Sequence, residues 1–148
     1  MRGTNLALAG IMAAPDRPGV AGKILNALGH NEINVQFIVQ CIDLNNCDNV
    51  VLCVSRDDLE TALSVLERVK EEVQAQGLTH IPEVATISIF GPDFRHRPAI
   101  AGTMFSALAS VGINILAIST SISTVSCVIS ADRLEDAEEI LRKTFDLP

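Results

Sequence analysis

The stretch from Asp16 to Gln40 contains the residues of this sequence that are best suited to bind a small anion. Pro18 fixes φ where a helix would begin, and Gly19 lets the backbone come close to a bound group. Apolar residues recur at helical spacing from Val20 to Leu28, and a strand that carries amide side chains follows. Because the free N–H groups at a helix N-terminus attract anions, we expect this helix and strand to hold a small carboxylate.

A set of strands and helices is expected to position this stretch. Apolar and β-branched runs predict strands, a capping residue and apolar stripes predict helices, and the segment LNNCDN predicts a turn. The expected elements are a strand over Thr4–Ala13, a helix closed by Gly29, a strand over Ile33–Ile42 and a strand over Asn49–Ser55. A second helix is expected to begin at a Ser55-x-x-Asp58 capping box and to end at Gly77. Its inward residues would be Leu59, Leu63, Leu66, Val69 and Val73.

The pattern then restarts at an offset of 80 residues, the separation of Pro18 and Pro98 (98 − 18). At this offset PGVAGKILNALGHNEINVQFI is aligned with PAIAGTMFSALASVGINILAI, and Pro, Ala, Gly, Ala, Leu, Ile, Asn and Ile coincide without a gap. The second copy is completed by expected strands over Val84–Phe90 and Ser121–Ser130 and by a helix with Leu134, Ala137, Ile140 and Leu141. The sequence therefore predicts a duplicated βαββα unit, with the two copies at residues 1–80 and 81–148.

Each copy needs one more edge strand to form a βαββαβ unit, in which an antiparallel sheet carries both helices on one face. The expected fold class is therefore α+β. A unit of this size buries too little apolar surface to be stable alone, so the two halves should pack together and against a second chain.

Composition and charge argue against several classes of function. The chain has 148 residues, of which 48% are apolar, no Trp or Tyr, and a formal net charge of −7. This charge disfavours nucleic acid and an anionic membrane as partners. No secretory signal or apolar run of about 18 residues is present, so we expect a cytoplasmic protein. The four cysteines and three histidines lack metal-site spacing, and no metal or cofactor is expected.

Four phrases in both halves carry a resemblance to a known family. The phrases D-R-P-G-V-A, I-N-V-Q-F-I-V-Q, G-I-N-I-L-A-I-S-T-S and L-R-K-T-F-D-L resemble the tandem ACT domains at the regulatory end of aspartate kinases, from about Ile11 to the C-terminus. The resemblance implies two ferredoxin-like βαββαβ units, pairing of the units into joined sheets in a homodimer, and a free amino acid, lysine or threonine, as the ligand. It also implies a regulatory chain without a catalytic centre, and a kinase catalytic subunit as a possible partner.

The same resemblance assigns roles to individual residues of the first half. It implies that Asp16 faces the ammonium group of the ligand and that the backbone of Gly19–Ala21 holds its carboxylate. Asn34 and Val35 would lie across the dimer seam, and Gln40 would contact the ligand side chain. The expected ligand-binding residues are thus Asp16, Gly19, Val20, Ala21, Asn34, Val35 and Gln40.

The second half departs from this pattern. His96 stands in place of Asp16, Ala99 replaces Gly19, and Ile122 stands where the family carries glutamate. We therefore expect the first half to hold the effector site and the second half to be structural, as part of an interface.

Two other functions remain open at this point. In the first, Arg17 and Asn34 would hold an anion and a water in a small acyl-phosphate hydrolase, although Asp16 would repel the anion. In the second, the chain would be a dimerisation module without a ligand. The same residues also have purely structural interpretations, in which Asp16 is a turn residue or helix cap and Asn34 and Asn114 hydrogen-bond their own loops.

Overall fold

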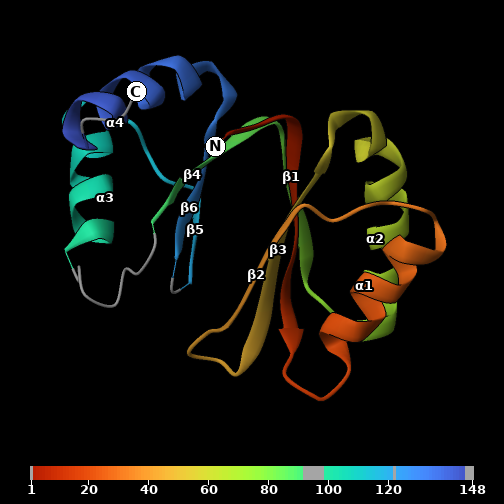
Figure 1. The fold of residues 1–148 in the computed structure, drawn as a ribbon. Coiled ribbons are helices and arrows are strands. Elements are labelled where there is room, and N and C mark those ends of the chain that lie inside the picture. Colours follow the sequence, from red (N-terminus) through yellow and green to blue (C-terminus); the bar gives the residue numbers. More distant parts are fainter. Residues whose placement is uncertain (1, 92–98, 122, 146–148) are drawn as a thin grey trace. The chain divides into compact units, whose positions relative to one another are not determined.

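The structure, a computed structural model, describes residues 2–91, 99–121 and 123–145, along which a strand, a helix, two strands and a helix occur twice in succession (Figure 1). The strands are β1 (Arg2–Pro15), β2 (Phe37–Ile42), β3 (Cys47–Ser55), β4 (Gly77–Phe90), β5 (Ala117–Thr120) and β6 (Thr124–Ser130). The helices are α1 (Val20–His30), α2 (Leu59–Val73), α3 (Ile100–Ser110) and α4 (Leu134–Phe145), with short 3-10 turns over Arg56–Asp58 and Ala131–Arg133.

The chain divides into two units, and two long strands contribute to both of them. The first unit is Asn5–Glu83, and the second comprises the described residues of Met1–Thr4 and Val84–Pro148. In the first unit the strand order is β2-β3-β1-β4, where β4 contributes residues 77–83 as the edge strand. In the second unit the strand order is β5-β6-β4-β1, and residues 2–4 of β1 form the edge strand next to β4. The last edge strand of each βαββαβ unit is thus supplied by one end of a long strand whose remainder belongs to the other unit.

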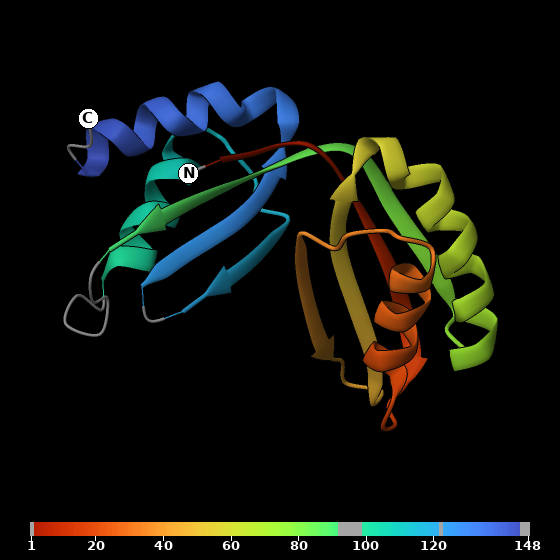
Figure 2. The same cartoon turned by 45° about the vertical axis from the view of Figure 1, so that its right-hand side comes forward.

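Within each unit neighbouring strands run antiparallel and two helices cover one face of the sheet (Figures 1 and 2). The predicted α+β class with two ferredoxin-like units is confirmed. No helix in the described part of the chain is long and apolar enough to cross a membrane.

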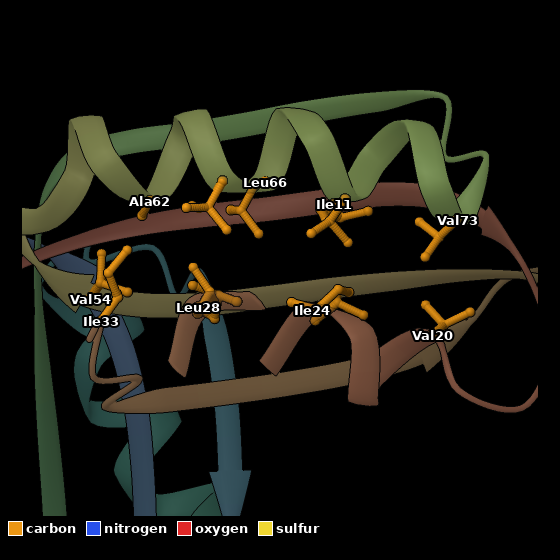
Figure 3. Packing of buried hydrophobic residues seen from close by; sticks show 14 of the residues in the cluster. Ile11, Val20, Ile24, Leu28, Ile33, Val54, Ala62, Leu66 and Val73 are labelled. Atoms are coloured by element: carbon orange, nitrogen blue, oxygen red, sulfur yellow. The ribbon is translucent and has the colours of Figure 1, made fainter. Parts of the chain in front are cut away.

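The core of the first unit forms because apolar residues alternate along β3 and recur every three to four residues along both helices. Figure 3 shows side chains from α2, among them Leu66 and Val73, facing Val20, Ile24 and Leu28 of α1 across this core. Fully burying one such side chain contributes about 1.5–3 kcal/mol to folding. The strand and helix residues of this buried cluster are Ala9, Ile11, Ala14, Val50, Leu52, Val54, Val20, Ile24, Leu28, Ala62, Val65, Leu66, Val69 and Val73.

The second unit repeats this core with different side chains. Ile100, Met104 and Leu108 of α3 occupy the positions that Val20, Ile24 and Leu28 occupy in α1. The buried strand and α4 residues are Ala85, Ile87, Ile89, Val125, Cys127, Ile129, Leu134, Ala137 and Leu141. Burial raises the pKa of the Cys127 thiol to about 11 and that of the Cys53 thiol to about 12, so both cysteines act as small apolar residues.

Two predicted helix ends are wrong. Helix α1 continues through Gly29 to His30, and the left-handed residue that follows is Glu32 (φ 58°). The Ile33 N–H donates to the Leu28 carbonyl at 3.0 Å, because the chain must turn where Ile33 enters the core. Helix α2 ends at Val73 with Gln74 left-handed (φ 59°), and Gly77 begins β4.

Strand β2 is shorter than predicted, since it begins at Phe37 and not at Ile33. Asn34 and Val35 therefore lie on the connection before the strand. The expected capping box also differs: Ser55 Oγ accepts a hydrogen bond from the Asp57 N–H at 3.3 Å and opens a 3-10 turn, after which α2 begins.

Candidate functional site

The N-terminus of α1 carries the predicted residues Gly19, Val20 and Ala21. Gly19 is its N-cap with φ 100°, a left-handed conformation that a residue with a Cβ atom adopts only at a cost. The Gly19 carbonyl accepts the first helical hydrogen bond, from the Lys23 N–H at 2.9 Å. Among the described residues no side chain caps this helix end, although Val20 is buried and Ala21 half-buried. The first-turn N–H groups and the helix dipole are therefore suited to a carboxylate.

The loop that carries Asp16 is tied to the β2–β3 hairpin. The Asp16 N–H donates to the Asn46 carbonyl at 3.0 Å, and Pro15 pairs with Cys47. The Asp16 side chain is exposed. Figures 1 and 2 show this loop and the hairpin at the same end of the first unit. Residues far apart in the sequence are thus brought to one end of the sheet.

Asp43 fixes the conformation of the hairpin turn. Its Oδ1 accepts hydrogen bonds from the Asn45 N–H at 2.8 Å and the Cys47 N–H at 3.1 Å, and its Oδ2 accepts one from Asn49 Nδ2 at 3.3 Å. These donors stabilise the carboxylate and lower the pKa of Asp43. Asn49 Oδ1 in turn accepts from the Ala13 N–H at 2.9 Å, which clamps the hairpin to β1.

Asp48 is a buried acidic residue at this end of the unit. It pairs with Ile42 on β2 and with Ala14 on β1, after a register shift in β1 between Ile11 and Ala14. Its side chain is only 1% exposed, and its Oδ1 is the buried side-chain atom that lacks a hydrogen-bond partner within residues 2–91, 99–121 and 123–145.

The environment of Asp48 places it beside two predicted site residues. Burial is the largest cause that raises the pKa of Asp48, and repulsion from the Asp16 carboxylate raises it further. A hydrogen bond from the Gln40 side chain acts in the opposite direction. Asp16, Gln40 and Asp48 therefore form one cluster, close to the N-terminus of α1. We call these three residues the acidic cluster.

Asp48 was missed by reasoning from the sequence, although a signal for it exists. In the run Asp48-x-Val50-x-Leu52-x-Val54 the aspartate occupies an inward position of the strand alternation. A carboxylate at such a position has to be buried or to lie at the rim of the core, and both are unusual for Asp.

Asn34 and Val35 do not join this cluster. Asn34 is exposed and Val35 packs against the core of the first unit, and both precede β2. Gln40 lies six residues after Asn34 along a mostly extended segment, a span of up to roughly 20 Å. Figures 1 and 2 show the connection before β2 at the opposite end of the first unit from the hairpin.

The second unit differs at the corresponding helix end. Ala99 is the N-cap of α3 with φ −85°, in the right-handed region. Asn114 is exposed, as Asn34 is. His96 and Ile122, which the sequence comparison places against Asp16 and the family glutamate, lie outside the described residues.

Neither the hydrolase alternative nor a metal site is supported by the arrangement of the described side chains. Arg17 Nη2 donates to the Glu72 carbonyl at 3.3 Å. In the part of the chain that the structure describes, no group of three or more His, Cys, Asp or Glu side chains has the arrangement of a metal site.

Comparison with known proteins identifies both halves as the same kind of domain. A family model described as "ACT domain" matches residues 11–73, and a second ACT domain model matches residues 87–145. Aspartate kinase from Pseudomonas putida is 39% identical over 137 residues, which cover 93% of this chain and 33% of that protein. The chain thus spans about a third of the length of this curated relative.

Two solved structures from the aspartate kinase family match over nearly the whole length of their chains. The ligand-free regulatory subunit of aspartate kinase from Thermus thermophilus is 31% identical, with a TM-score of 0.87 over 98% of this chain and 95% of that one. A structure of aspartokinase alpha and beta subunits is also 31% identical, with a TM-score of 0.90 over 99% of this chain and 97% of the other. The chain therefore belongs to the family of aspartate kinase regulatory subunits, and its two ACT domains make it a regulatory amino-acid-sensing module rather than the catalytic part of a kinase.

Proposed function

We propose that the first unit binds a free amino acid at the N-terminus of α1 and thereby regulates an aspartate kinase. The observation that carries the proposal is the convergence of Asp16 and Gln40 beside a helix end whose N-cap, Gly19, is left-handed and uncapped by side chains in the described chain. An amino-acid zwitterion needs an acceptor for its ammonium group close to donors for its carboxylate, and this arrangement offers both.

In this proposal each predicted residue of the first unit has a role. The N–H groups of Gly19, Val20 and Ala21 bind the ligand carboxylate, and Asp16 binds its ammonium group. Gln40, whose side chain is exposed beside Asp48, contacts the ligand side chain. Lysine and threonine are the ligands to test first, as the family resemblance implies.

The remaining parts of the proposal concern assembly. Asn34 and Val35, at the other end of β2, belong to the seam of a homodimer rather than to the ligand itself. The similarity to a structure of aspartokinase alpha and beta subunits supports association of this chain with another aspartokinase subunit. We propose that this partner is a kinase catalytic subunit and that the complex is cytoplasmic. Residues 81–148 supply structure and interface in this arrangement. Binding of the amino acid would be coupled to substrate binding by the kinase with a free energy of about 1–3 kcal/mol, which is typical of allosteric regulators.

No observation favours the hydrolase alternative, because Arg17 donates to the Glu72 carbonyl and two carboxylates, Asp16 and Asp48, would repel a phosphate group. A ligand-free dimerisation module would leave the acidic cluster without a role.

Isothermal titration calorimetry with L-lysine, L-threonine, L-leucine, L-isoleucine and L-valine tests the proposal. We expect one or more of them to bind with a Kd in the micromolar to millimolar range, and the affinity to fall in an Asp16→Asn variant. If no amino acid gives a binding signal at millimolar concentration, with the dimer and the paired kinase subunit present, the proposal is wrong.

A further inference from the structure

The acidic cluster contains one more carboxylate than the proposed site requires. Asp48 is 1% exposed, and its Oδ1 has no hydrogen-bond partner among the described residues, although the Asp16 and Gln40 side chains lie beside the same carboxyl group. A buried carboxylate oxygen without a donor is unfavourable, so in a functional site it marks the place of a missing donor.

The groups around Asp48 indicate what that donor is. The charged groups that act on it are Asp16, on the loop after β1, and Asp43, in the hairpin turn, and both are acidic. Gln40 of β2 supplies an amide, and β1 contributes Ala14 opposite Asp48. No cation among the described residues compensates the two neighbouring carboxylates of Asp16 and Asp48. A compact cation with several N–H donors, such as a primary ammonium group, satisfies both carboxylates and the amide oxygen at once.

The position of the pair relative to α1 decides which ammonium group fits. Asp16 lies three residues before Gly19, where the ligand carboxylate is proposed to bind, and the α-ammonium group of an amino acid is attached to the carbon next to that carboxylate. A group held between Asp16 and Asp48 is thus the α-ammonium rather than a group at the end of the side chain.

We propose that Asp48 is a ligand-binding residue that holds the α-ammonium group of the amino acid together with Asp16, and that the site releases a proton as the ligand enters. This inference rests on the proposed function of the same site. In the empty site burial and the neighbouring Asp16 carboxylate favour the protonated form of Asp48, and the incoming ammonium group takes the place of this proton, which passes to solvent. Binding therefore weakens as the pH falls.

The test compares Asp48→Asn with the wild-type protein by calorimetry, with L-lysine and L-threonine as probes, between pH 5.5 and 7.5. Acetate and MES are the buffers at the acid end, and phosphate and imidazole are the buffers at the neutral end. The difference in heat between buffers of unlike ionisation enthalpy gives the number of protons released. We expect proton release by the wild-type protein at the acid end of this range, and none by Asp48→Asn. We also expect Asp48→Asn to bind both amino acids at least tenfold more weakly at pH 7.5.

Two further measurements keep the test decisive. 6-Aminohexanoate, which is lysine without its α-ammonium group, should show at least a hundredfold loss of affinity. Glu60→Gln, which removes an exposed carboxylate from the first turn of α2, should leave affinity and proton release unchanged. Asn closely matches Asp in shape, and the melting temperature of Asp48→Asn reports whether the first unit remains folded.

Three outcomes overturn the inference while the proposed function stands. The first is equal affinity and equal proton release in Asp48→Asn and the wild type, and the second is no proton release by the wild type. The third is weaker binding of only one of the two amino acids by Asp48→Asn. The last outcome would mean that Asp48 contacts the ligand side chain. If the wild-type protein binds no amino acid, the proposed function fails and this inference fails with it.

Discussion

The two units of this chain have the same core and different helix N-termini. Leu28 and Leu108 are both fully buried at corresponding positions of α1 and α3. The N-caps of the same two helices differ, because Gly19 is left-handed (φ 100°) and Ala99 is right-handed (φ −85°). The apolar positions that both copies retain specify the fold, and the positions at which they differ distinguish the proposed site from its structural counterpart.

The hairpins show the same division. Val50 on β3 and Val125 on β6 are both buried, and each pairs with the edge strand of its unit. Two residues before Val50 stands the buried Asp48, whereas two residues before Val125 stands the exposed Ser123. The first unit thus places a charged group where its copy has none, at a cost in stability that a bound ligand can offset.

The largest expected effect tests the shared part of the comparison. Leu28→Ala and Leu108→Ala each remove a fully buried side chain, and each should lower the free energy of unfolding by about 2–5 kcal/mol. Urea denaturation monitored by circular dichroism measures both. A cost below about 1 kcal/mol in one variant would contradict the equivalence of the two cores.

Asp16→Asn should give the next largest effect, and it acts on ligand affinity. Loss of a hydrogen bond to a charged group is worth about 1.5–3 kcal/mol, so the Kd for the amino acid should rise roughly tenfold to a hundredfold. Calorimetry measures the change. Asp57→Asn, in the exposed 3-10 turn before α2, is the control and should bind like the wild type.

Exchanging the two N-caps sharpens the comparison further. Gly19→Ala introduces a Cβ atom at φ 100° and should cost about 1–2 kcal/mol, together with a loss of ligand affinity. Ala99→Gly, at φ −85°, should cost no more than about 1 kcal/mol and leave affinity unchanged. Thermal denaturation and calorimetry on the pair measure both quantities. Equal effects of the two exchanges would contradict the division of roles between the units.

The smallest expected effect is a dependence of stability on pH at Asp48. Its pKa in the folded protein is raised above the ordinary value of 3.8, chiefly by burial, so the fold binds this proton more tightly than the unfolded chain does. The resulting stabilisation is complete below pH 3.8 and is lost as the pH rises through the raised pKa. Asp48→Asn should therefore melt a few degrees above the ligand-free wild type at pH 7, and this advantage should disappear towards pH 3.8. Scanning calorimetry across this range measures it, and an advantage independent of pH would refute the explanation.

Much of the fold was predictable because it depends on local periodicity. The buried positions of α1, such as Ile24 and Leu28, recur in α3 and follow from spacing alone. The predicted end of α1 at Gly29 is wrong because the chain turns where Ile33 enters the core, which no local pattern records. The predicted end of α2 at Gly77 is wrong because Gln74 is left-handed and Gly77 already belongs to β4. Helix termini are generally the least certain part of such a prediction.

The candidate site was only partly predictable for a similar reason. Asp16 and Gly19 follow from turn chemistry and from the family resemblance. Asp48 is brought to Asp16 by the register of β1 and β3, including the shift between Ile11 and Ala14, and register is a tertiary property. Asn34 was placed on a strand that in fact begins three residues later, at Phe37.

The most direct test of the account is a titration of 15N-labelled protein with L-lysine and L-threonine, followed by backbone amide chemical shifts. We expect the largest shift changes in the first unit, at Asp16 to Ala21, Gln40 and Asp48, and little change in the core of the second unit around Leu108. Shift changes confined to residues 84–145, or none with any amino acid, would contradict it.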